Sequence, residues 1–157
     1  MKKFVTASTK IGMLVLISIA ALAASAKAQT LGNGLRANIP FDFTVAGKKF
    51  AAGYYSITRA TQTNGDLVLE VNSLDEHSRV LPITSRMETL TARDKSILIF
   101  HRYGDEYFLA EIWPVGSETG RELPKTRAER ELARKAQDSG VAAINTPAVQ
   151  TITLTVN

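Results

Sequence analysis

Side chains that could take part in acid–base chemistry lie close together between residues 101 and 107. The segment holds His101, Arg102, Tyr103, Asp105, Glu106 and Tyr107. A histidine titrates near neutral pH, so His101 could act as a general base if Glu106 or Asp105 oriented its ring. The segment offers no nucleophile, however, and Arg102 beside Tyr107 is also an ordinary cross-strand cation–π pair. A hydrolase-type site is therefore one hypothesis, and a structural role for this segment is the other.

Metal binding has less support in the sequence. The two histidines, His77 and His101, are far apart, and the chain has no cysteine. Residues 75–77 (Asp-Glu-His) could offer oxygens and one nitrogen, but a zinc site usually takes three or four protein ligands. No loop matches a calcium-binding EF-hand or a glycine-rich phosphate cradle. We therefore expect neither a metal site nor a cofactor.

Two further groups of side chains could bind a ligand or a partner. Aromatic residues crowd into residues 100–113, and they either line a pocket for an apolar or carbohydrate ligand or form the core of a central hairpin. They are Phe100, Tyr103, Tyr107, Phe108 and Trp113. Arg127, Arg130 and Arg134 form a basic ridge at helical spacing that could meet an acidic partner. Residues 118–138 as a whole hold six basic and five acidic residues, which favours a solvated, salt-bridged face.

The residues of the 101–107 segment must be positioned by strands. Two largely apolar runs, 97–103 and 106–113, flank Gly104-Asp105, a dipeptide that suits a two-residue hairpin turn. Both faces of these runs are largely apolar, so we expect central strands covered on each side. The predicted register pairs Tyr103 with Glu106, Arg102 with Tyr107, His101 with Phe108, and Ile99 with Ala110.

Further strands are predicted on both sides of this hairpin. Leu35–Val45 has six apolar residues at every second position, although Pro40 indicates an edge strand or a bulge. Other strands are expected at 50–58, 67–71, 80–84 and 149–156, and residues 116–120 are expected to form a loop. The sequence therefore predicts a mostly β domain. We expect an antiparallel small sandwich or a partly open barrel of about seven strands, with one helix in its C-terminal half.

The helix is predicted over residues 126–138. Thr126 followed by Glu129 is a capping box, in which the two side chains satisfy backbone N–H groups at the start of the helix. The helix carries little apolar surface, which predicts that it docks lightly on the sheet or projects into solvent. That surface consists of Ala128, Leu132, Ala133 and Ala136.

The N-terminus is typical of an export signal. Lys2 and Lys3 precede an uncharged apolar stretch, residues 11–24, which is shorter than the roughly 20 residues of a membrane-spanning helix. Small-x-small sites end at residues 26 and 28, and we favour the second. We therefore expect a signal peptide over 1–28 and one domain over 29–157. The mature chain would be periplasmic or extracellular, with no membrane span after cleavage.

Signal cleavage would change the charge of the protein. The chain has 19 basic and 15 acidic residues, a net charge of +4. Four of the basic residues and none of the acidic ones lie within residues 1–28, so the remaining chain carries 15 of each. A neutral domain does not support nucleic-acid binding through a basic surface. Without cysteine, the exported domain must be stabilised by packing and sheet hydrogen bonds rather than disulfides.

Three segments in fixed order give the chain a resemblance to a known family. They are IPFDFTVAGKKFAAGYYSI, FHRYGDEYFLAEIW and GRELPKTRAEREL, and the resemblance covers roughly Leu35 to Ala133. The chain resembles a family of small exported bacterial proteins, common in acidobacteria, that carries no assigned activity. The resemblance implies one exported domain, and it assigns no catalytic residues to this chain. Ala51 departs from it, since a proline is expected in the family's turn.

A strong fold pattern without an assembled reactive set leads to one main hypothesis. We expect a non-catalytic domain of the cell envelope that binds an envelope protein or a small ligand through its β scaffold. The first alternative is a hydrolase-type enzyme that uses His101 with Glu106 or Asp105. The second is a structural envelope protein that self-associates through its proline-marked edge strands.

Overall fold

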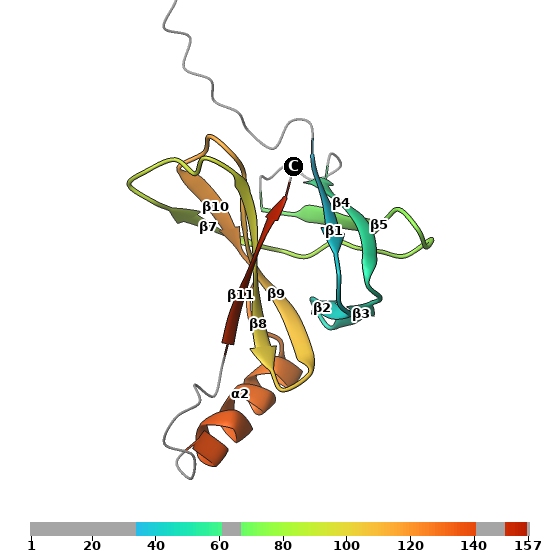
Figure 1. Ribbon diagram of the computed structural model, residues 1–157, viewed down its shortest axis with the longest axis vertical. Helices are drawn as coiled ribbons and strands as arrows, with labels where there is room; N and C mark the ends of the chain where they lie inside the picture. Colours follow the sequence, from blue (N-terminus) through green and yellow to red (C-terminus); the bar gives the residue numbers. More distant parts are fainter. Residues whose placement is uncertain (1–33, 61–66, 141–149, 157) are drawn as a thin grey trace, which may run out of the picture.

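The computed structural model describes residues 34–60, 67–140 and 150–156 (Figure 1). The predicted signal peptide lies outside these residues. Over the described residues the chain forms eleven strands in two sheets and one helix in the C-terminal half. The prediction of a mostly β fold with one late helix is thus confirmed, and the two-sheet arrangement agrees with the sandwich.

The first sheet has four strands in the order β1-β4-β5-β6. Their bounds are β1 Leu35–Ile39, β4 Gly53–Arg59, β5 Leu69–Ser73 and β6 Arg79–Val80. All three neighbouring pairs are antiparallel. Apolar side chains at every second position of β1, β4 and β5 point into the core, while the alternate positions are more exposed. The alternation of apolar and polar residues in the sequence predicted half-buried strands of this kind.

The second sheet is built around a long central hairpin and has the order β11-β8-β9-β10-β7. Its strands are β7 Ser85–Glu88, β8 Ser96–Tyr103, β9 Glu106–Trp113, β10 Thr119–Glu122 and β11 Gln150–Val156. Two short strands, β2 Phe43–Val45 and β3 Lys48–Phe50, pair with each other, and β2 also runs parallel to the start of β9. The helix α2, Arg127–Gly140, lies below the tip of the β8–β9 hairpin (Figure 1).

The predicted strand Leu35–Val45 is in fact two strands in different sheets. β1 pairs with β4 in the first sheet, and β2 pairs with β9 in the second. The chain crosses between the sheets at residues 40–42, because Pro40 has no N–H to donate to a ladder. The alternation of buried apolar residues continues across the crossing, since Ile39 and Phe43 are both buried in the common core. The prediction of burial was right, and the prediction of one continuous strand was wrong.

The central hairpin has the predicted register near its turn and a different register farther away. The Tyr103–Glu106, Arg102–Tyr107 and His101–Phe108 pairs are confirmed. Ile99, however, lies opposite Glu111 and not Ala110, because the register shifts between Ile99 and Phe100. This shift has the character of a β-bulge, in which one strand carries an extra residue. The carbonyl of Ala110 instead accepts the N–H of Leu123 at 2.8 Å.

Two other boundaries differ from the prediction. Residues 50–58 divide into the end of β3 and the beginning of β4, with a break at 51–52. Residues 119–122, half of which were expected to lie in a loop, form β10, which pairs with both β7 and β9. Its sequence TGRE shows no apolar alternation, and Arg121 is nevertheless buried. Together with β7, which follows the expected strand 80–84 as a separate strand, these two splits and β10 explain why eleven strands are described where about seven were expected.

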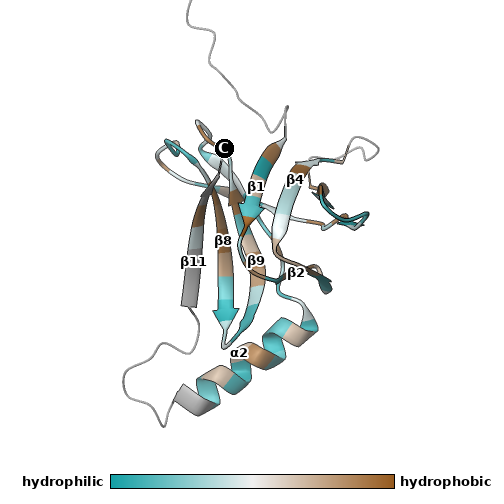
Figure 2. Cartoon of the chain, turned by 45° about the vertical axis from the view of Figure 1, so that its right-hand side comes forward, coloured by the Kyte–Doolittle hydropathy of each residue, from teal (hydrophilic) through white to brown (hydrophobic). Residues whose placement is uncertain are grey.

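Figure 2 shows α2 as mostly hydrophilic, with an apolar patch near its middle. Leu132, Ala133 and Ala136 are half-buried, whereas Ala128 is exposed. The thin apolar stripe therefore docks the helix lightly, as predicted. Within the part of the chain that the structure describes, no helical segment has the length and apolar character that a membrane crossing demands.

Candidate functional site

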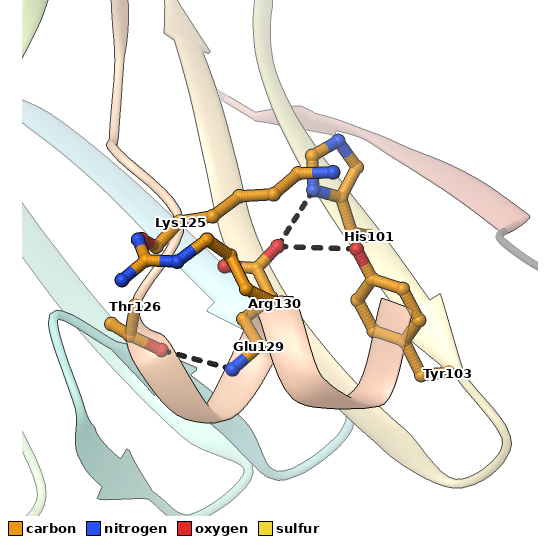
Figure 3. A network of polar contacts seen from close by, with 6 residues as sticks. All are labelled: His101, Tyr103, Lys125, Thr126, Glu129 and Arg130. Atoms are coloured by element: carbon orange, nitrogen blue, oxygen red, sulfur yellow. Dashed lines mark hydrogen bonds and ion pairs between the residues drawn. The ribbon is translucent and has the colours of Figure 1, made fainter. Parts of the chain in front are cut away.

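The predicted base His101 is in contact with a buried carboxylate, that of Glu129. Nδ1 of His101 lies 2.9 Å from Oε1 of Glu129, and the hydroxyl of Tyr103 lies 3.4 Å from the same oxygen (Figure 3). Because a carboxylate only accepts hydrogen bonds, the imidazole N–H and the phenol are the donors. Glu129 is 5% exposed, so both contacts are sheltered from water. We call these three side chains the Glu129 network.

Helix capping places Glu129 in this position. The hydroxyl of Thr126 accepts the backbone N–H of Glu129 at 3.2 Å, as expected of an N-cap residue. The predicted capping box also expected the Glu129 side chain to reach back to Thr126. Its carboxylate contacts His101 and Tyr103 on β8 instead. The first turn of α2 is therefore joined to the sheet by the residue that the pattern had assigned to local capping.

In the Glu129 network a carboxylate orients a histidine, as it would for a general base. The network itself, however, contains no nucleophile that the histidine could activate. Glu129 holds the imidazole by Nδ1, which is the role that the hydrolase hypothesis gave to Glu106 or Asp105. Glu106 and Asp105 instead lie at the tip of the hairpin, and Asp105 is paired with Arg102 at 3.7 Å. Burial and the Glu129 charge raise the pKa of Tyr103 to about 12, so its phenol keeps its proton. The hydrolase alternative stays a prediction.

The raised pKa of Tyr103 predicts a loss of stability in alkali. The fold favours the neutral phenol, so its contribution is complete below pH 10 and is lost as the pH rises through about 12. Between pH 8 and pH 11.5 the wild-type free energy of unfolding should fall by ~2 kcal/mol more than that of Tyr103→Phe. Urea unfolding of both proteins at the two pH values measures this. Burial also raises the pKa of Tyr55, but that effect is common to both proteins. Equal losses would contradict the prediction.

The hairpin tip lines a pocket on the other side of β9. The pocket has a volume of about 300 Å³ and is lined by residues 42–44, 49–51 and 105–107. These segments come from β2 with the residue before it, from β3 with the residue after it, and from the β8–β9 turn with the start of β9. The pocket forms where β2 and β9 diverge, since these strands are paired only at Thr44 and Phe108. We call it the tip pocket.

The polar groups of the tip pocket differ in how far they are already engaged. Oδ1 of Asp42 accepts the N–H of Ala52 at 2.9 Å, and Asp105 is held by Arg102. Over the described residues, neither Glu106 nor Lys49 has an ion pair or a side-chain hydrogen bond. Thr44 also lines the pocket and is 9% exposed. Acceptors and one ammonium group therefore face a space that a ligand could enter.

The aromatic residues expected near the hairpin divide between core and pocket. Phe100, Phe108 and Trp113 are buried, which agrees with the core interpretation. Trp113 lies opposite Ile97, at the far end of β9 from the tip, whereas His101 lies opposite Phe108. Tyr107 lines the tip pocket, with its ring stacked on Phe41 at 4.1 Å and Arg102 5.4 Å from its centroid.

The basic ridge is exposed along α2. Arg127, Arg130 and Arg134 are all at the surface, and Arg127 pairs with Glu131 at 3.0 Å.

Among residues 34–60, 67–140 and 150–156, no group of three or more His, Asp or Glu side chains could hold a metal ion.

Sequence reasoning missed Glu129, Asp42, Thr44 and Lys49 as site residues. Glu129 had a sequence signal, the capping box, but that signal indicated a local role. Thr44 and Lys49 lie on the short strands β2 and β3, and Asp42 directly precedes β2; their polar residue types resemble an ordinary solvated face. Comparison of the chain with models of protein families, with curated proteins and with solved structures found no match.

Proposed function

We propose that this chain is an exported, non-catalytic β domain of the cell envelope. In this proposal the tip pocket binds a small ligand or a side chain presented by a partner protein. The pocket is the observation that carries the proposal, because binding sites are concave, largely preformed and few in each protein. The export signal predicted for residues 1–28 supports the location.

The walls of the tip pocket are held by the core, so a ligand would not have to order them. Phe43 and Phe50 are buried, and their rings stack with centroids 5.6 Å apart. Asp42 is fixed by the N–H of Ala52, and Tyr107 is fixed by Phe41. A preformed site loses little conformational entropy on binding, which favours affinity for a small molecule.

A binding role fits these residues better than a catalytic one. The tip pocket is lined by neither His101 nor Glu129, so the base with its orienting carboxylate does not face the space that a ligand would enter. The carboxylates and the hydroxyl of the pocket can hold a ligand by hydrogen bonds and charge without a reaction.

Filling the tip pocket should abolish ligand binding. Ala51 is exposed and lines the pocket, so Ala51→Trp places an indole within it at little cost in stability. We expect a mixture of small amines, alcohols, carboxylic acids and sugars to shift the amide resonances of residues 42–44 and 105–107. These shifts should be lost in Ala51→Trp, as measured by ¹H–¹⁵N correlation spectra.

Ala52→Trp is the matched control, because Ala52 is also exposed but does not line the tip pocket. It should bind as the wild type does. The proposal fails if none of the compounds shifts the pocket resonances, or if Ala51→Trp responds like Ala52→Trp.

A further inference from the structure

We infer that the protein forms a symmetric dimer in which strand β7 pairs with β7 of a second copy. This inference goes beyond the proposed function, because β7 does not line the tip pocket. Three independent features of the strand carry it: the direction of its backbone groups, the order of its charges, and the apolar side chains on either side of it. An unpaired sheet edge is a ready template for another strand.

The outer side of β7 has no neighbouring strand among the described residues. On its inner side, next to β10, the N–H of Thr89 donates to the carbonyl of Glu118 at 2.8 Å. Bonded and non-bonded positions alternate along an antiparallel pair, so Met87, two residues earlier, also bonds to β10. The backbone N–H and C=O groups of Arg86 and Glu88 therefore point to the outer side of the sheet.

The charges of β7 are complementary to those of an inverted copy of the same strand. Arg86 and Glu88 lie on one face of the strand, with Nε of the first 3.4 Å from Oε1 of the second, and both are exposed. In an antiparallel pair centred on Met87, Arg86 of each copy lies opposite Glu88 of the other. The same register brings their outward backbone groups face to face, so each opposite-charge pair also exchanges N–H···O=C bonds.

Large apolar side chains are exposed on both sides of β7. Ile83 is 68% exposed and Leu90 is fully exposed. With Met87 at the centre of the pair, Leu90 of one copy is level with Thr84 of the other, next to that copy's Ile83. Dimerisation would therefore cover apolar surface at both ends of the paired strands, which adds a hydrophobic contribution to the backbone bonds.

The other sheet edges are less suited to a second copy. β6 is two residues long, and β11 lies beside β1. β3 carries Lys48 and Lys49 without an acidic residue, so a second copy would meet like charge there. Charged side chains discourage edge pairing when they oppose like charges, whereas the Arg–Glu order of β7 sets opposite charges against each other in an antiparallel pair.

Charge reversal on β7 tests the inference. Sedimentation equilibrium of the purified chain at low ionic strength, up to about 1 mM, should show a monomer–dimer equilibrium. Arg86→Glu and Glu88→Arg each set like charges opposite one another, and each should weaken dimerisation about tenfold or more. An equal mixture of the two variants restores both opposite-charge pairs and should associate about as tightly as the wild type. A misfolded variant would not regain association in this way.

Two matched variants separate contacts at the β7 edge from general effects of charge and apolar surface. Arg127→Glu makes the same charge reversal on the exposed face of α2 and should leave dimerisation unchanged. Leu90→Ser should weaken dimerisation about three- to tenfold, because it removes apolar surface that the dimer buries. Leu74→Ser removes a half-exposed leucine that follows β5 in the first sheet, and should have no effect.

Amide hydrogen exchange tests the backbone pairing itself. The amides of Arg86 and Glu88 should exchange rapidly in dilute solution and become protected as the protein is concentrated. The amide of Met87 faces β10 and should be protected at every concentration. The inference is overturned if the chain stays monomeric, if the mixed variants associate no better than each variant alone, or if exchange at Arg86 and Glu88 does not depend on concentration.

Discussion

Replacing Glu129 with alanine is expected to release α2 from the sheet. Within residues 127–138 of this helix Glu129 alone is buried, and its carboxylate accepts from both His101 and Tyr103. Its removal leaves two sheltered donors without an acceptor, and the apolar stripe of α2 is too thin to compensate. The free energy that protects the α2 amides from hydrogen exchange should fall by ~3 kcal/mol.

Two substitutions in the same helix serve as controls for Glu129→Ala. Glu129→Gln keeps an acceptor oxygen of the same reach and should lose only about 1 kcal/mol. Glu131→Ala removes an exposed carboxylate that is paired with Arg127, and should change the protection by less than ~0.5 kcal/mol. Unchanged protection of α2 in Glu129→Ala would show that the helix is held by something other than the Glu129 network.

Replacing Gly120 with alanine is expected to lower the free energy of unfolding by ~3 kcal/mol. A Cβ at this position would lie 2.6 Å from Cδ2 and Cε3 of Trp113, far inside contact distance. The indole has little room to move, because its Nε1 donates to Glu111 at 2.7 Å and Arg93 lies 5.0 Å from its ring centroid. Urea unfolding of the variant and the wild type measures the difference.

Gly47→Ala separates steric conflict from backbone preference. A Cβ at Gly47 would meet nothing within 4 Å, but its φ of +85° lies in the region that disfavours other residues. This variant should therefore lose only about 1 kcal/mol. If Gly120→Ala were no worse than Gly47→Ala, the packing of Trp113 against β10 would be looser than the structure indicates.

The sequence predicted those parts of the fold that depend on neighbours along the chain. The β8–β9 turn follows from Gly104-Asp105, and the start of α2 follows from Thr126, since both are fixed within a few residues. Alternation also identified the core positions of β1 and β2. It could not tell that β1 and β2 belong to different sheets, because burial has the same period in both. The register shift between Ile99 and Phe100 could not be predicted either, because Leu109 and Ala110 can each occupy a buried position.

The candidate site was less predictable for a related reason. His101 and Glu129 are 28 residues apart, and their contact depends on where α2 docks. The polar residues of the tip pocket come from three segments that alternation places on strands or turns, without indicating that β2 and β9 diverge there. Thr44 has the residue type of an ordinary surface strand position, and only the pairing of β2 with both β3 and β9 buries it.

The crossing at residues 40–42 means that the segment holding all four strands of the first sheet also holds two strands of the second. The polypeptide leaves the first sheet after β1, contributes β2 and β3 to the second, and then returns to the first for β4. Cutting the chain between β6 and β7 would therefore leave the first sheet joined to two strands whose partner, β9, is on the other fragment. The cut would remove the Thr44–Phe108 pairing and expose core side chains of both sheets, so we expect the two sheets to unfold as one cooperative unit.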